Sequence, residues 1–165
     1  MRQRSLIVGG IIVIVVAVLW YLFRPELLFI NKTVSEEFPG AKVASTSPQP
    51  VAFSVGRFYS LAHETKGTAT IHQLPNGKRV LRLTEFETSN GPDVRVYLVA
   101  AADAKDNETV KKAGFIDLGA MKGNKGDQNY EVAADIDLNK YRSVSIWCRR
   151  FGVNFGAAPL ALERG

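Results

Sequence analysis

An uncharged apolar run near the N-terminus constrains this chain more than any other feature. Leu6–Phe23 contains only apolar and small residues, and at about 1.5 Å of helical rise per residue it is long enough to cross most of a bilayer core. Arg2 and Arg4 precede the run, and Trp20 and Tyr21 lie near its far end, where membrane-interface aromatic residues are expected. The run therefore predicts one membrane-spanning helix with its N-terminus in the cytoplasm and the rest of the chain on the extracytoplasmic side, periplasmic or cell-surface.

A cleaved signal peptide is the alternative interpretation of this run. The run is longer than the apolar region of most signal peptides, and Arg24-Pro25-Glu26 stands where a small-x-small cleavage site would be expected. Arg24 also weakens the charge difference between the two ends of the run. A lipoprotein is excluded because the only cysteine, Cys148, is far from the N-terminus. The membrane anchor is the interpretation that we carry forward.

The rest of the chain divides into a tether and one domain. We predict an anchor over residues 1–30, a linker over residues 31–50 and a β domain over residues 51–165. The linker contains Pro39-Gly40 and the segment Ser45–Pro50, a composition that favours extended, solvated chain. Within the anchor, Leu27–Ile30 is a second short apolar patch that could extend the helix or lie in the membrane interface.

The charge distribution argues against a nucleic-acid-binding protein. The formal net charge is +5, but from Asn31 onward 18 Lys and Arg residues face 15 Asp and Glu residues. The two signs are interspersed, whereas nucleic-acid binders concentrate Lys and Arg on one face. We therefore expect no nucleic acid as a partner, and the apolar run makes the membrane the expected one.

Short β-rich runs separated by turn residues follow from Val51 onward, which predicts an all-β domain, an antiparallel sandwich or barrel. The predicted strands are Gly56–Leu61, Thr68–Leu74, Arg79–Phe86, Val94–Ala100, Phe115–Gly119, Asn129–Val132, Arg142–Arg149 and Val153–Leu160. Pro75–Lys78 predicts a tight hairpin turn through Asn-Gly, and Asp106–Ala113 predicts one short helix with a polar cap. The Gly-rich segment Lys122–Asp127 lacks the spacing of a phosphate-binding loop, so we expect a surface loop there.

Cys148 is the first candidate functional residue. In Val144–Cys148, strand alternation places Val144, Ile146 and Cys148 on one face, so the thiol is expected to point toward the core. A buried cysteine of this kind is often a small packing residue. Arg149 and Arg150 follow directly, and a thiol near them could be reactive, because their charges would stabilise the thiolate.

His63 is the second candidate, because it lies in a predicted turn, whereas His72 shares a strand face with Thr68 and Thr70 and is expected to face solvent. Cysteine sulfur and imidazole nitrogen are both suitable ligands for heme iron or copper, so Cys148 and His63 form a candidate cofactor-binding pair. Two ligands do not define a metal site, and the metal stays unknown. The chain has no CxxC, CxxCH, HExxH or GxSxG motif.

Several ordered motifs resemble the DM13 domain family over about Gly56 to Leu160. The motifs are Gly56-Arg-Phe58, His63–Ile71, Leu81-Arg-Leu83 with Phe86, Asn90-Gly-Pro-Asp93 with Tyr97-Leu98, Gly126–Tyr130, Tyr141–Phe151 and Asn154-Phe155-Gly156. Gly91-Pro92-Asp93 belongs to the pattern, but a rigid turn before the Val94 strand would produce the same residues.

The resemblance implies a β-rich extracytoplasmic module that takes part in electron transfer at the cell surface. In animals such domains occur beside DOMON and cytochrome b561-type modules. The signature cysteine of the family matches Cys148, and the resemblance implies that it acts as a naked thiol or helps to hold a prosthetic group such as heme. It does not place His63 near the thiol.

Two functions follow as expectations. The first is a membrane-tethered redox or electron-transfer module that uses Cys148 as its reactive or cofactor-binding residue and has an envelope redox protein, or another envelope protein, as its partner. The second is a non-enzymatic envelope or cell-surface binding domain in which Cys148 is a core residue. A hydrolase or transferase comes third because no pair of base and nucleophile is evident, so whether the chain is an enzyme stays open.

Overall fold

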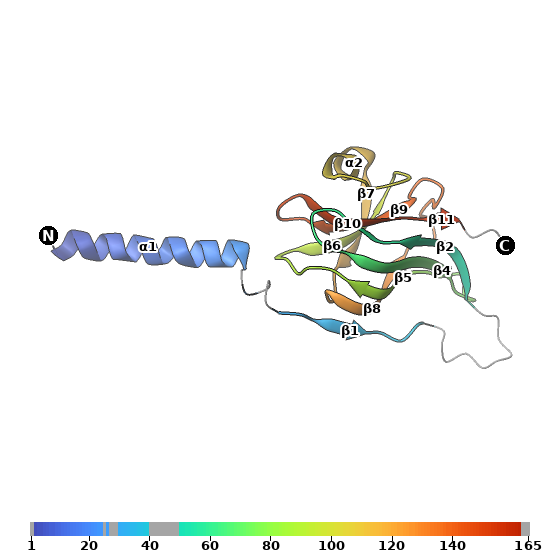
Figure 1. Cartoon of the computed structure of the whole chain (residues 1–165), viewed down its shortest axis with the longest axis horizontal. Coiled ribbons are helices and arrows are strands. Elements are labelled where there is room, and N and C mark those ends of the chain that lie inside the picture. Colours follow the sequence, from blue (N-terminus) through green and yellow to red (C-terminus); the bar gives the residue numbers. More distant parts are fainter. Residues whose placement is uncertain (1, 25, 27–29, 40–49, 163–165) are drawn as a thin grey trace.

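The computed structural model describes residues 2–24, 26, 30–39 and 50–162, which form a long helix and a β domain (Figure 1). Helix α1 (Arg2–Phe23) projects from the domain. Within it, Leu6–Phe23 has a mean hydropathy of 2.9, and none of this segment is buried against the domain. The chain therefore has one apolar N-terminal helix that fits a membrane anchor or a signal sequence.

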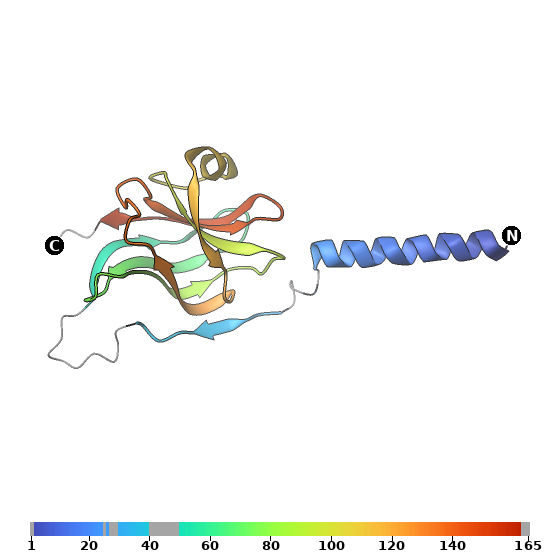
Figure 2. The same ribbon diagram turned by 180° about the vertical axis from the view of Figure 1, so that it is seen from behind.

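The β domain is a sandwich of two sheets, as the sequence predicts, and the views from both sides show the two layers (Figures 1 and 2). The larger sheet contains, in spatial order, β1 (Thr33–Ser35), β8 (Lys125–Val132), β5 (Arg79–Glu87), β4 (Lys66–Gln73), β2 (Val51–Arg57) and β11 (Ala161–Leu162). The smaller sheet contains β3 (Tyr59–Ser60), β10 (Val153–Pro159), β9 (Ser143–Cys148), β6 (Val94–Val99) and β7 (Phe115–Ala120). Neighbouring strands are antiparallel except β1 and β8, which are parallel.

The predicted hairpin and the predicted short helix are both present. The turn after β4 is closed by hydrogen bonds between Leu74 and Lys78 and from the Gly77 N–H to the Leu74 carbonyl. Gly77 has a φ of +80°, which glycine adopts at little cost. Helix α2 (Asn107–Ala113) begins after Asp106, whose carboxylate accepts a hydrogen bond from the Thr109 N–H at 2.7 Å.

Two local predictions differ from the structure. Gly56–Leu61 is not one strand: β2 ends at Arg57 in the larger sheet and β3 begins at Tyr59 in the smaller one. Phe58 lies between them with its side chain buried in the core, so the chain changes sheets at this residue. The prediction of a surface loop over Lys122–Asp127 is wrong in its second half, because β8 already begins at Lys125 and pairs there with β5 and β1.

Strand β1 lies in the segment predicted as a linker. Thr33, Val34 and Ser35 pair with Lys125, Gly126 and Asp127 of β8. The chain thus runs along the edge of the larger sheet after it leaves α1 (Figures 1 and 2). Residues 40–49 of the predicted linker, and Leu27–Phe29 of the second apolar patch, lie outside the described residues.

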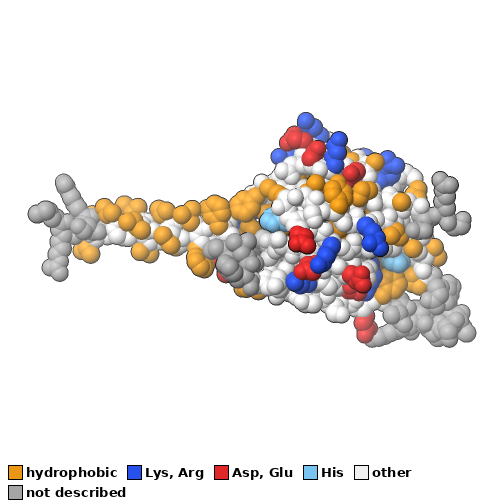
Figure 3. All heavy atoms as spheres, in the orientation of Figure 1, with side chains coloured by type: hydrophobic (Ala, Val, Ile, Leu, Met, Phe, Trp, Pro, Cys, Tyr) orange, Lys and Arg blue, Asp and Glu red, His pale blue; other side chains and the backbone are white. Residues whose placement is uncertain are grey.

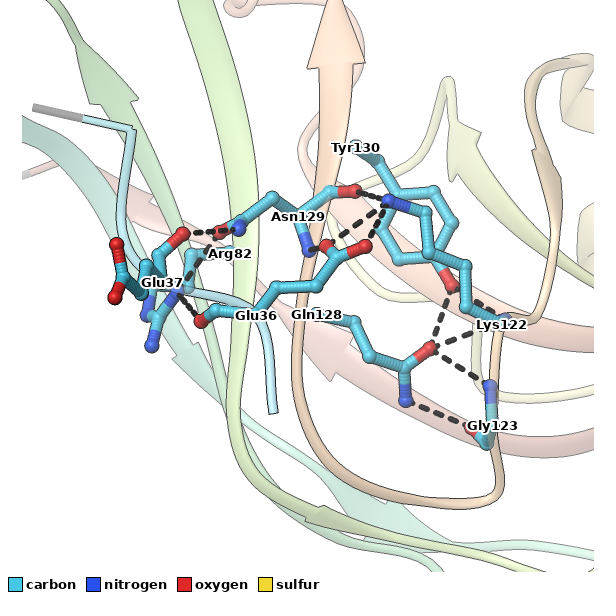
Figure 4. Close-up of polar contacts among 8 residues, drawn as sticks. All are labelled: Glu36, Glu37, Arg82, Lys122, Gly123, Gln128, Asn129 and Tyr130. Atoms are coloured by element: carbon cyan, nitrogen blue, oxygen red, sulfur yellow. Dashed lines mark hydrogen bonds and ion pairs between the residues drawn. The ribbon is translucent and has the colours of Figure 1, made fainter. Parts of the chain in front are cut away.

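A polar network follows β1 and joins it to the sheet (Figure 4). The Glu36 carboxylate accepts hydrogen bonds from Lys122 Nζ at 2.8 and 2.9 Å and from the Asn129 N–H at 2.7 Å. The Glu36 carbonyl accepts a hydrogen bond from the Arg82 guanidinium, and the Glu37 carbonyl accepts one from the side-chain amide of Asn129. These contacts hold Glu36 and Glu37 against the larger sheet, although the composition of this segment favours solvated chain.

The domain has two hydrophobic clusters, one on each side of the smaller sheet. The main core lies between the sheets and includes Val96, Val144 and Ile146. The second cluster lies on the outer face of the smaller sheet, where α2 and the chain before it cover Tyr97 and Trp147. Both faces of β9 are therefore covered, which is why every residue of this strand is buried.

Candidate functional site

Cys148 ends β9 and points into the main core. Its backbone pairs with Val94 of β6 and Val153 of β10, and its side chain has no exposed surface. It shares the core with Val144 and Ile146, as strand alternation predicts. The surroundings of the thiol are therefore apolar.

Arg149 and Arg150 turn away from the thiol. Arg149 Nε donates to Asp93 Oδ2 at 2.7 Å, and the Arg149 N–H donates to the Asp93 carbonyl at 2.9 Å. The hydrogen bond and charge of Asp93 raise the pKa of Arg149. Arg150 donates to the Leu22 carbonyl at the end of α1. The contacts described for these two arginines are thus with Asp93 and α1, and none of them would stabilise a Cys148 thiolate.

The segment Gly91-Pro92-Asp93 is a turn directly before β6. Asp93 accepts hydrogen bonds from the side chain and the backbone N–H of Arg149. The turn before β6 is therefore fixed to the turn that follows Cys148. A Cβ atom on Gly91 would lie 3.2 Å from the Phe155 ring and 2.9 Å from a Val94 methyl carbon. A larger residue at this position would therefore have to displace the Val94 and Phe155 side chains.

His63 packs against Phe155 and not against Cys148. The ring centroids of His63 and Phe155 are 3.9 Å apart, and the His63 N–H donates to the Phe155 carbonyl at 3.2 Å. Burial lowers the pKa of His63, which favours the neutral imidazole. Phe155 belongs to the same core cluster as Cys148. His63 is therefore linked through Phe155 to the core cluster that contains Cys148, and the contacts described for His63 are with Phe155 and not with the thiol.

The family described as Electron transfer DM13 matches residues 57–160. This match covers well over half of the chain, including the turn at Asp93, Cys148 and His63. The chain belongs to the DM13 family. No curated protein and no solved structure matches it significantly.

The DM13 domain does not offer a formed heme or copper site around Cys148 and His63. The described parts of the chain contain no group of three or more His, Cys, Asp or Glu residues that could hold a metal ion. Because the Cys148 side chain is fully buried, a heme could reach its sulfur only by displacing core side chains. These residues therefore do not fit either group in the arrangement described.

A stack of aromatic rings on the outer face of the DM13 domain's smaller sheet was not predicted. The rings of Tyr97 and Phe115 lie parallel with centroids 4.1 Å apart, and those of Tyr97 and Trp147 are 6.3 Å apart. Trp147 is adjacent to Cys148 in sequence, and Phe115 is 43% exposed. The stack thus leads from the strand of the cysteine to the surface. Strand alternation puts Trp147 on the outer face, but the pairing of β6 with β7 and β9 cannot be read from the sequence.

Tyr59 lies at the edge of the same cluster. Its hydroxyl donates to Asp103 Oδ1 at 2.7 Å. Burial, and then the hydrogen bond and charge of Asp103, raise the pKa of Tyr59 far above its ordinary value. This phenol therefore stays protonated.

The surface of the domain carries charges of both signs. Figure 3 shows Lys, Arg, Asp and Glu side chains mixed over one face, while apolar side chains cover α1.

Proposed function

We propose that this chain is a membrane-tethered, extracytoplasmic electron-transfer module that uses Cys148. The match to a family described as electron transfer, which covers Cys148, carries this proposal. In this role the Cys148 thiol first gives one electron and its proton to an oxidised redox protein, and the resulting thiyl radical then regains one electron and one proton from a reduced redox protein at the membrane surface. The domain is thereby returned to its starting state.

The ring stack gives the proposal a route to the surface. Trp147, Tyr97 and Phe115 connect the end of β9 with solvent through rings at most 6.3 Å apart. A redox partner would approach the exposed ring of Phe115, which is 43% accessible. His63 as a second ligand stays a prediction, because only its contact with Phe155 links it to the core that holds Cys148.

The electron-transfer role is tested on the purified full chain in lipid nanodiscs. We expect a redox couple in voltammetry that is lost in both Cys148→Ser and Cys148→Ala. Circular dichroism must show that both variants keep the β fold. A redox-silent protein with a native fold would contradict the proposal.

A non-enzymatic binding domain is the second candidate, and one observation favours it. Cys148 has no exposed surface and lies among apolar side chains, as a packing residue does. In that case the thiol should react with an alkylating reagent only when the protein unfolds. A thiol that reacts in the native state would contradict this second candidate.

The proposed topology has its own test. Arg2 and Arg4 before the apolar run support a cytoplasmic N-terminus, and the length of Leu6–Phe23 supports a retained anchor. We expect a protease added outside intact cells or spheroplasts to digest the domain and to leave an N-terminal tag protected. A domain that is digested only after the membrane is permeabilised would overturn the topology.

A further inference from the structure

The tip of the β9–β10 hairpin meets the end of the apolar helix. In both views this tip is the part of the smaller sheet that reaches toward α1 (Figures 1 and 2). The ring of Phe151, at the tip, stacks on Phe23 with centroids 5.8 Å apart. Phe151 is nevertheless 48% exposed, so much of its ring has no protein partner.

The helix fixes the depth of this tip relative to a membrane. Phe23 is the last residue of the apolar segment Leu6–Phe23, so in a bilayer it lies at the boundary between hydrocarbon and headgroups. A ring stacked on Phe23 lies at the same depth. Arg150, beside Phe151, donates to the Leu22 carbonyl at 3.1 Å and lies over the Tyr21 ring at 5.9 Å. Its guanidinium therefore lies close to the same boundary, from which a long Arg side chain can reach a lipid phosphate.

A cavity of about 380 Å³ lies beside the turn of Asp93, the residue that Arg149 of the hairpin binds. Arg24, Lys32 and Lys122 contribute to its lining, together with Asp93. Asp93 is already bound by Arg149 of the hairpin turn at 2.7 Å. The Lys32 ammonium forms no ion pair within the described part of the chain. Arg24 and Lys122 are paired with Glu26 and Glu36, so the charge that this lining can offer to an anion is that of Lys32.

We propose that this end of the domain is a docking surface for anionic phospholipid headgroups. Phe151 inserts at the headgroup boundary, while Arg150 and Lys32 bind lipid phosphates. The proposal rests on the proposed function in one respect, because it requires α1 to span the membrane. It goes further in that the folded domain itself contacts the bilayer and is held in one orientation.

The test uses the full chain in nanodiscs of phosphatidylcholine, with or without phosphatidylglycerol. A polarity-sensitive fluorophore is attached through Phe151→Cys, and through Phe115→Cys as the matched control. Phe115 is a similarly exposed phenylalanine, but it lies at the opposite end of the smaller sheet, where it pairs with Val99. The wild-type chain, treated in parallel, sets the background from the buried Cys148.

We expect the Phe151→Cys probe to emit at shorter wavelength than the Phe115→Cys probe and to be quenched by lipids that carry a spin label near the headgroup. Phosphatidylglycerol should increase both effects. Arg150→Gln combined with Lys32→Gln should remove that increase, whereas Lys78→Gln combined with Lys140→Gln, the same charge change elsewhere, should leave it in place.

The outcomes separate this inference from the proposed anchor. A chain that does not co-elute with nanodiscs overturns the anchor and the docking surface together. A chain that co-elutes, but whose two probes are equally exposed to water, overturns the docking surface alone. Equal quenching in neutral and anionic nanodiscs overturns the recognition of anionic headgroups.

Discussion

At the scale of single residues, Cys148 is fixed, within the described part of the chain, by apolar packing and not by hydrogen bonds to its side chain. Its sulfur lies in an apolar core without exposed surface, and the arginines after it bind Asp93 and the end of α1. Any redox role must therefore operate through a buried group. This makes the choice of substitution at Cys148 informative.

Cys148→Ala and Cys148→Ser should differ in stability. Alanine leaves a small cavity, which we expect to lower the free energy of unfolding by about 1–2 kcal/mol. Serine adds a hydroxyl among apolar side chains, and an unpaired buried hydroxyl costs roughly 1–3 kcal/mol. Denaturant unfolding of the full chain in detergent measures both. A serine variant as stable as the alanine variant would show that a polar partner reaches this position.

Two glycines with positive φ should respond differently to alanine. At Gly67, with φ +113°, a Cβ would lie 2.8 Å from the Thr84 carbonyl oxygen and from Phe86 Cα. Backbone strain and overpacking each cost about 1–3 kcal/mol, so Gly67→Ala should lose several kcal/mol. At Gly77, with φ +80°, a Cβ meets nothing within 4 Å, and Gly77→Ala should lose only the strain, about 1 kcal/mol. Equal losses in denaturant unfolding would show that the close approach at Gly67 is unimportant.

The sequence predicts the direction of Cys148 but not its partners. Alternation along a strand has a period of two residues, so the face of Cys148 follows from its neighbours alone. The partner of Arg149 is Asp93, which is 56 residues away, and only the pairing of β6 with β9 brings them together. His72 shows the same limit: it is half-buried because the ring of Phe38, from the chain after β1, packs on it at 4.7 Å.

At the scale of elements, β1 is the feature that composition conceals. A strand of three residues surrounded by Asn, Lys, Ser, Glu, Pro and Gly has no hydrophobic pattern to mark it. Its position depends on small residues in its neighbour: Cβ atoms at Gly123 and Gly126 would collide with the carbonyl oxygens of Lys32 and Val34. Long, alternating strands such as β5 and β9 are readable from sequence because burial of one or both faces dictates their residues.

The docking of β1 should weaken in acid. Burial raises the pKa of Glu36, but the hydrogen bonds from Lys122 and Asn129 outweigh it, and the net pKa is below the ordinary 4.5. A carboxyl group whose pKa is lower in the docked state stabilises docking above pH 4.5, and this contribution is lost as the pH falls through the lowered pKa. The backbone N–H of Asn129 donates to the Glu36 carboxylate. The NMR chemical shift of this backbone amide should therefore follow the titration.

Glu36→Gln provides the control for that titration. It keeps the shape of the side chain but has no proton to gain in this range, so the Asn129 amide shift should be nearly independent of pH below 5. A wild-type amide that titrates no more than the Glu36→Gln amide would contradict the role of the carboxylate.

At the scale of the whole molecule, the domain should include more of the chain than its composition suggests. A chain that begins at Asn31 keeps β1, whereas one that begins at Val51, the predicted start of the domain, loses it. Because β1 and Glu36 satisfy backbone and side-chain groups of β8, we expect the shorter chain to lose on the order of 2 kcal/mol of unfolding free energy. Equal denaturation midpoints of the two chains, with equal denaturant dependence, would show that β1 adds nothing.

The parallel pairing of β1 with β8 has a mechanical consequence. Strand β1 follows α1 in the chain and runs along the sheet edge away from the helix (Figure 1). A force that pulls the domain away from the bilayer therefore acts along β1, and it loads the hydrogen bonds to β8 and the contacts of Glu36 together in shear. Such bonds resist jointly, whereas a peeled strand loses its bonds one after another. The short edge strand can thus serve as a clamp that keeps the domain close to its anchor under load.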